Sequence, residues 1–230
     1  MTGALLKVIA CIAMALSHFG YVFHQVLPPV LVDIFYFTGR ISFPIFAYLI
    51  TEGWSYTSNK TKYMGRLFLF AIISQIPYVL ALSGTEPANF EWNVMLTLFL
   101  GSCSLALEDA SLDATGKKKW LLLLAALVPV AIGFFVPMDY GWAGVAAIYL
   151  MGLFRDNRYF RLAVLTVAMA LVYMLEFSVY YSVAFLFTLP GIFLLYCYNG
   201  MRGRVKYKVL FYLFYPLHLM VLYLVEKVIV

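Results

Sequence analysis

Long apolar runs separated by short polar stretches make up most of this chain. A helix that crosses a membrane needs about 20 mostly apolar residues, and about nine runs approach that length. They are residues 4–23, 30–54, 63–82, 93–107, 120–136, 142–154, 160–175, 179–198 and 209–225. The pattern predicts an all-α polytopic transmembrane helical bundle of about nine spans, folded as a single integral membrane domain over residues 1–230.

Composition agrees with a lipid bilayer as the main partner. Hydrophobic residues make up 64% and charged residues 12% of the chain, against about 25% charged residues in soluble domains. A soluble domain of this size could not cover so much apolar surface. The net charge of +5 is spread over short clusters between apolar runs, which argues against nucleic acid as a partner.

Basic residues occur in alternate loops, and acidic residues occupy the loops between them. Because cytoplasmic loops are enriched in Lys and Arg, this alternation predicts an odd number of spans with a cytoplasmic N-terminus. No cleavage site follows the first run, so no removable signal peptide is expected. The basic residues are Lys7, Lys60, Lys62, Arg66, Lys117, Lys118, Lys119, Arg155, Arg158, Arg161, Arg202, Arg204, Lys206 and Lys208; the acidic ones are Glu86, Glu91, Asp139 and Glu176.

Three ionisable side chains fall near one depth of the predicted bundle. Counting from the cytoplasmic ends of their spans at about 1.5 Å per residue, His18 lies near ~16 Å, Arg40 near ~18 Å and His218 near ~15 Å. Ionisable groups at mid-membrane depth are costly and usually functional. A neutral imidazole beside a guanidinium suits proton abstraction and anion stabilisation.

Structural interpretations remain open for each of the three. Arg40 could cross-link helices, His18 could be a core histidine bonded to a carbonyl, and His218 could satisfy backbone broken by Pro216. No metal is expected, because two histidines without a carboxylate at the same level make an incomplete site. The cysteines, which lie in apolar runs, are interpreted as small hydrophobic residues; they are Cys11, Cys103 and Cys197.

Several of these residues fall in motifs that together resemble the TraX family of membrane proteins. The motifs run in order over nearly the whole chain, and at Ser17 the sequence departs from the Asp that the family usually has. They are His18-Phe19-Gly20, Gly39-Arg40-Ile41-Ser42-Phe43-Pro44-Ile45-Phe46, Glu91-Trp92-Asn93, Asp139-Tyr140-Gly141, Tyr198-Asn199-Gly200-Met201-Arg202-Gly203 and Phe214-Tyr215-Pro216-Leu217-His218-Leu219.

The resemblance implies a membrane-embedded acyltransferase of the bacterial plasma (inner) membrane that uses acetyl-CoA or another acyl-CoA and needs no metal. The family's founding member is associated with N-acetylation of a conjugative pilin. On this hypothesis an amine or hydroxyl of a protein, lipid or glycan acceptor receives the acetyl group. The expected catalytic residues are His18, Arg40 and His218; acyl-CoA binding is expected of Glu52, Arg66, Arg202 and Arg204, and acceptor binding of Asn93, Asp139 and Tyr215.

Two other functions fit the same residues. A small-solute or proton-coupled transporter would also place His and Arg at mid-membrane depth. It usually shows internal repeats, and here only a homodimer could supply that symmetry. A non-catalytic envelope assembly factor would leave the common predicted depth of His18, Arg40 and His218 in the membrane unexplained.

Overall fold

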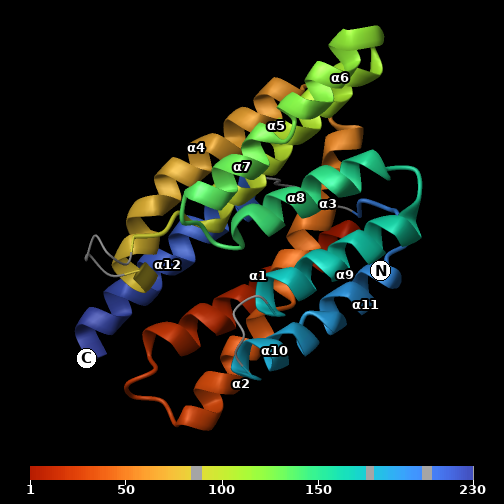
Figure 1. The fold of residues 1–230 in the computed structure, drawn as a ribbon. Coiled ribbons are helices and arrows are strands. Elements are labelled where there is room, and N and C mark those ends of the chain that lie inside the picture. Colours follow the sequence, from red (N-terminus) through yellow and green to blue (C-terminus); the bar gives the residue numbers. More distant parts are fainter. Residues whose placement is uncertain (84–89, 175–178, 204–208, 230) are drawn as a thin grey trace. The chain divides into compact units, whose positions relative to one another are not determined.

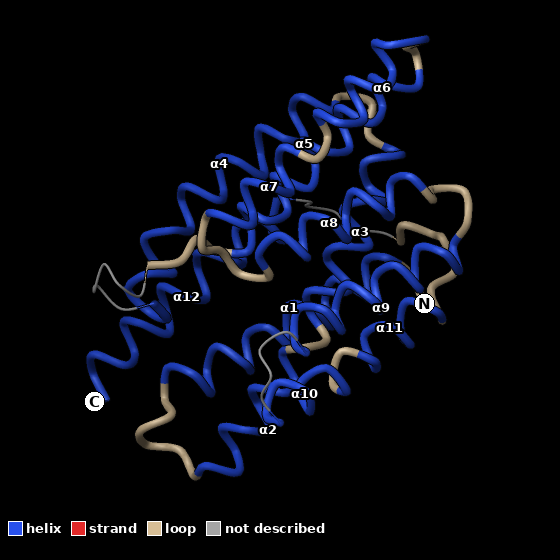
Figure 2. The backbone as a smooth tube through the Cα atoms, viewed as in Figure 1, coloured by secondary structure: helices blue, strands red, loops and turns tan. Residues whose placement is uncertain are grey.

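The computed structural model describes residues 1–83, 90–174, 179–203 and 209–229, and within these ranges the regular elements are helices, with one isolated bridge between Trp92 and Met138. Figures 1 and 2 show the helices along the chain. They are α1 (Gly3–Val22), α2 (Pro29–Gly39), α3 (Ser42–Tyr56), α4 (Lys60–Tyr78), the π-helix η1 (Val79–Ser83), α5 (Val94–Leu112), α6 (Gly116–Ala125), α7 (Val128–Phe135), α8 (Gly141–Leu153), α9 (Arg158–Met174), α10 (Val179–Leu186), α11 (Leu189–Tyr196) and α12 (Val209–Ile229).

Several of these helices are long and apolar enough to cross a membrane, so the chain is an all-α, multi-pass membrane protein. Within the described residues six stretches meet that criterion, and the prediction of about nine spans is not confirmed by it. The remaining predicted spans correspond to α8, α9 and the pair α10–α11, which are shorter helices. The six stretches are Gly3–Val22, Pro29–Tyr56, Lys60–Leu82, Val94–Leu112, Gly116–Phe135 and Val209–Ile229.

Three of the predicted spans are each divided into two helices, and a proline lies in the first turn of each second helix. Pro129 follows the break between α6 and α7, and Pro190 follows the break between α10 and α11. Pro44 lies in the first turn of α3, after the break at Arg40 and Ile41. Proline fits a first helical turn, where its missing N–H has no partner to lose. Within the apolar runs, these prolines mark where a new helix begins.

The chain divides into two compact units; the prediction of a single domain is not tested by this division. Unit 1 comprises Met1–Phe46, Ile72–Phe90 and Ser178–Val230. In it α1 packs against α2 and α12, and η1 contacts both α1 and α12. The Ser42 hydroxyl donates a hydrogen bond to the carbonyl of Ala10 at 2.9 Å, which ties the start of α3 to α1.

Unit 2 comprises Ala47–Ala71 and Glu91–Phe177, and α5 is its most buried long helix. Helix α5 packs against α6, α7 and α8, and α8 packs against α9. At Gly101 a β-carbon would lie 2.6 Å from the Ile148 side chain, so only glycine allows α5 and α8 to approach this closely. Small residues at helix contacts are typical of membrane bundles, where backbones must come close to gain packing energy.

Candidate functional site

Two histidines from opposite ends of the chain meet inside unit 1. His18 of α1 and His218 of α12 place Nδ1 and Nε2, respectively, 2.8 Å apart. Their rings are tilted by only 8° and their centroids are 5.1 Å apart. With such a short distance between the nitrogens, the rings meet edge to edge, so that an N–H of one ring can point at the nitrogen lone pair of the other, which is the geometry of a hydrogen bond. Both side chains are partly buried.

The hydrogen bonds around the pair determine which nitrogen carries each proton. His218 Nδ1 lies 2.7 Å from the Phe214 carbonyl, which can only accept, so Nδ1 carries the proton and donates. In a neutral His218 ring, Nε2 then accepts, and His18 Nδ1 must donate to it. In a neutral His18 ring, Nε2 therefore keeps its lone pair. The arrangement makes His18 Nε2 the basic atom of the pair.

Arg40 lies at the break between α2 and α3, near the histidine pair. Its Nε donates to the Tyr36 carbonyl at 3.3 Å, and its guanidinium lies 4.1 Å from the centroid of the Tyr36 ring. The charge of Arg40 acts on His18, so the two groups are within electrostatic range. The structure thus brings His18 and His218 into contact, with Arg40 within electrostatic range of His18, and the catalytic roles predicted for the three residues are not tested.

Close packing of α1 on α2 brings His18 and Arg40 together. A β-carbon on Gly39 would overlap the Ser17 side chain, and one on Gly20 would lie 2.7 Å from the β-carbon of Phe35. The two helices can therefore approach only because positions 20 and 39 are glycines. Since His18 follows Ser17 and Arg40 follows Gly39, this contact sets the spacing of the two functional side chains.

Tyr215 also belongs to this part of unit 1. Its side chain is 3% exposed, and its ring centroid lies 6.3 Å from that of His18 and 5.8 Å from that of His218. The neighbouring Pro216 lies inside α12. His218 bonds the carbonyl of Phe214, whereas the carbonyl one helical turn before Pro216 is that of Tyr212, so this bond does not show the expected repair of backbone at the proline. The same ring also reaches His18.

The predicted acceptor-binding residues Asn93 and Asp139 lie together in unit 2. Thr97 donates from its hydroxyl to the Asp139 carbonyl at 2.5 Å, and the backbone of Asp139 bonds that of Trp92. The Asn93 side chain is fully buried: its Oδ1 accepts from Met95 N–H at 3.0 Å, and its Nδ2 donates to the Ala71 carbonyl at 2.8 Å. Asn93 thus caps α5. Its predicted role in binding is not tested.

The residues predicted to bind acyl-CoA fall in both units, and their predicted role is not tested. Glu52 and Arg66 belong to unit 2, where the Arg66 guanidinium lies 5.9 Å from the Tyr63 ring centroid. Arg202 is exposed and belongs to unit 1, and Arg204 lies outside the described residues. No cluster of three or more His, Cys, Asp or Glu side chains that could hold a metal occurs within the described ranges.

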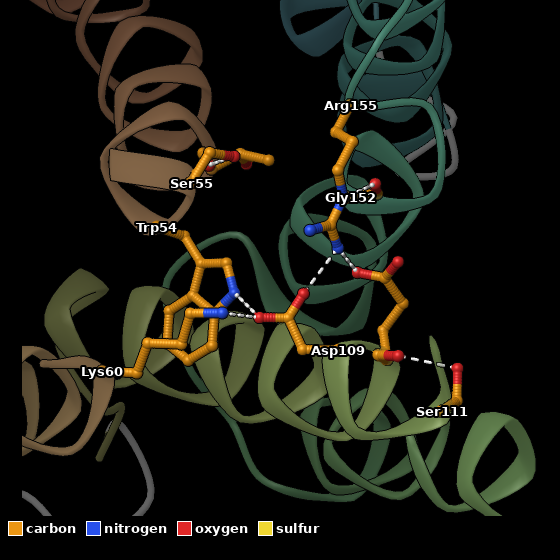
Figure 3. Close-up of polar contacts among 9 residues, drawn as sticks. Trp54, Ser55, Lys60, Asp109, Ser111, Gly152 and Arg155 are labelled. Atoms are coloured by element: carbon orange, nitrogen blue, oxygen red, sulfur yellow. Dashed lines mark hydrogen bonds and ion pairs between the residues drawn. The ribbon is translucent and has the colours of Figure 1, made fainter. Parts of the chain in front are cut away.

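A polar network that the sequence did not predict lies at one end of α5, in unit 2. Figure 3 shows its side chains converging on Asp109. Asp109 accepts a hydrogen bond from Trp54 Nε1 at 2.8 Å and pairs with Lys60. Arg155 contacts Asp109 at 2.8 Å and also pairs with Glu108, whose side chain is 4% exposed. Two cations face two carboxylates, so the charges of this ion network balance.

The ion network explains the charge state of Arg155. Burial alone would lower its pKa, but hydrogen bonds and charges from Asp109 and Glu108 outweigh that effect and raise the pKa above its ordinary value. The pair Glu108-Asp109 follows the predicted span 93–107, where two adjacent acids end an apolar run. That pair was the available signal, but its partners lie more than 40 residues away along the chain.

Comparison with known proteins places the chain in a family. The family model described as TraX protein matches residues 2–226. The chain is also 29% identical, over 94% of its length and 92% of the relative's, to "Probable fimbrial assembly protein FimC, serogroup H1" of Dichelobacter nodosus. No solved structure matches the chain. Since the family model spans nearly every residue, including both histidines of the pair, the chain belongs to the TraX family.

Proposed function

We propose that the protein is a membrane-embedded acetyltransferase that moves an acetyl group from acetyl-CoA, or a related acyl-CoA, to an amine or hydroxyl. The observation that carries the proposal is the hydrogen bond between His18 and His218, which leaves a lone pair on His18 Nε2. A general base needs such an atom, because it must present an unprotonated nitrogen to the acceptor.

The proposed reaction follows from these three side chains. His18 Nε2 takes the proton from the acceptor N–H or O–H as the acceptor bonds to the thioester carbonyl carbon. Arg40, whose charge acts on His18, stabilises the oxyanion that forms. As the C–S bond breaks, His18 returns the proton to the leaving sulfur, and CoA departs as a thiol. His218 is a positioning residue: its Nε2 holds the His18 Nδ1 proton throughout.

Topology and acceptor are part of the same proposal. Alternation of loop charge puts the N-terminus in the cytoplasm, so acetyl-CoA would enter from the cytoplasm across the bacterial inner membrane. A relative is named as a probable fimbrial assembly protein, which supports a pilin-like acceptor outside the cytoplasm. The same name favours a second candidate, a non-catalytic assembly factor, and only a measurement of chemistry separates the two.

The test is release of CoA thiol from acetyl-CoA by the purified protein in detergent, with a pilin-derived peptide as acceptor. His18→Ala and Arg40→Ala should each lower the rate by about 100-fold or more, with little change in melting temperature. His24→Ala is the matched control, because His24 is an exposed histidine whose Nδ1 lies 2.8 Å from the carbonyl of Tyr21. Undiminished release in both site variants would overturn the enzyme and favour the assembly factor.

A further inference from the structure

Another arginine of unit 2, Arg161, is buried, and it forms no ion pair with a carboxylate of the described residues. It lies in the first turn of α9 and is 7% exposed. Its guanidinium lies 4.0 Å from the Tyr48 ring centroid, and Nη2 donates to the Tyr48 carbonyl at a long 3.4 Å. Within the part of the chain that the structure describes, its Nε is buried and has no hydrogen-bond acceptor.

Such a guanidinium is incompletely satisfied. It carries five N–H donors and remains charged at any physiological pH. A buried charge without a counter-charge, and a buried donor without an acceptor, each raise the free energy of the folded protein. The nearby Arg155 illustrates the usual solution, since Glu108 and Asp109 neutralise it. Among the described residues no carboxylate pairs with Arg161, so the geometry calls for an anion supplied from elsewhere.

Two other charged side chains lie within electrostatic range of Tyr48, the residue that Arg161 contacts. Besides Tyr56, the groups that act electrostatically on the Tyr48 side chain are Arg161, Glu52 and Arg158, two cations to one carboxylate. Arg158 begins α9 and is partly exposed, so this region reaches the protein surface. The N-terminus of a helix also favours anions through its unpaired N–H groups and its dipole.

We propose that Arg161 and Arg158 form a binding site for a phosphate group in unit 2. A guanidinium binds phosphate oxygens through two parallel N–H bonds, and a phosphate would supply the acceptors that Arg161 lacks. The phosphate could belong to a soluble polyphosphate ligand or to the headgroup of an anionic lipid. Its identification with the phosphates of the acyl donor rests on the proposed function; the site itself does not.

The experiment uses the full chain and two phosphate sources. Sodium pyrophosphate and CoA are titrated against the protein in an uncharged detergent, and nanodiscs with and without phosphatidylglycerol provide the lipid. Binding to the native state raises the melting temperature by mass action. Arg161→Met should weaken pyrophosphate binding by about 10- to 100-fold, and Arg161→Lys should recover part of it. Lys62→Met, which removes an exposed cation of the same unit, is the control.

The ligand-free melting temperature separates a binding role from a structural one. Replacing an unmatched buried charge with an apolar side chain of similar length should not lower it. A lower melting temperature in Arg161→Met with unchanged pyrophosphate and lipid responses would overturn the site, as would a wild-type protein that responds to neither source. A response to phosphatidylglycerol alone, lost in Arg161→Met, assigns the site to lipid.

Failure of this proposal is distinguishable from failure of the proposed function. Pyrophosphate binding needs no turnover, so it can persist in a protein that releases no CoA. Conversely, CoA release that depends on His18 but not on Arg161 would retain the enzyme and show that the phosphate site does not serve the acyl donor.

Discussion

The histidine pair of unit 1 and the ion network of unit 2 differ in how completely their buried polar groups are paired. In the ion network, Lys60 and Arg155 match Glu108 and Asp109, and the Trp54 indole adds a further hydrogen bond. In the histidine pair, His18 donates to His218 and His218 donates to the Phe214 carbonyl. These described bonds leave the lone pair on His18 Nε2 available. A closed network stabilises the fold, whereas an open one leaves an atom available for chemistry.

This contrast predicts different losses when each region is damaged. Breaking the ion network should cost stability first and activity only through loss of folded protein. Breaking the histidine pair should cost activity with the fold intact.

The largest effect is expected from Arg155→Met. The substitution leaves Glu108, which is 4% exposed, with a buried and unmatched charge, and it should lower the free energy of unfolding by about 3 kcal/mol. Thermal unfolding in detergent measures it. The double variant Glu108→Met with Arg155→Met removes both charges and should recover at least half of the loss. If the double variant is no more stable than the single one, charge matching is not what holds this end of α5.

A smaller effect is expected at His218, and it should fall on rate rather than stability. His218→Leu removes the acceptor for His18 Nδ1–H, which should lower kcat about 10-fold. His218→Gln can place an amide oxygen near the former Nε2 and should retain most of the activity. The pH profile of kcat should shift in the Leu variant, because the basic atom of His18 is no longer fixed. Equal rates and unchanged profiles in both variants would contradict the positioning role.

The smallest effect is expected at the exposed edge of the ion network. The Lys60 side chain is 45% exposed, and Asp109 keeps Arg155 and Trp54 when Lys60→Met removes this cation. Exposed ion pairs contribute about 0.2–1 kcal/mol, so the loss of unfolding free energy should lie in that range and should shrink at high salt. A loss as large as that of Arg155→Met would mean that burial does not determine how much each cation contributes to the free energy of unfolding.

The sequence predicted the helical segments well, because apolar runs of membrane length leave few alternatives. It also predicted one depth for His18, Arg40 and His218, because helix rise converts position along the chain into depth; the structure shows the contact of the two histidines and does not test the depth. It did not predict that residues 30–54, 120–136 and 179–198 each form two helices, although Pro44, Pro129 and Pro190 lie next to the breaks.

The ion network was missed for a different reason. Its members come from α3, α4, α5 and the segment between α8 and α9, and only tertiary packing shows that they meet. The basic residues Lys60 and Arg155 were interpreted only as indicators of cytoplasmic loops, because Lys and Arg in loops commonly mark that side of the membrane. Likewise, Arg161 looked like any other loop arginine until its burial and the identity of its neighbours were known.

The contact between Ser17 and Gly39 has a consequence for how this family varies. Because the Ser17 side chain occupies the space that a β-carbon on residue 39 would need, the sizes of these two residues are coupled. Because the β-carbon of residue 17 already lies in that space, relatives with any residue other than glycine at position 17 should retain glycine at position 39. Their coupling would then record, in evolution, the separation that α1 and α2 maintain between His18 and Arg40.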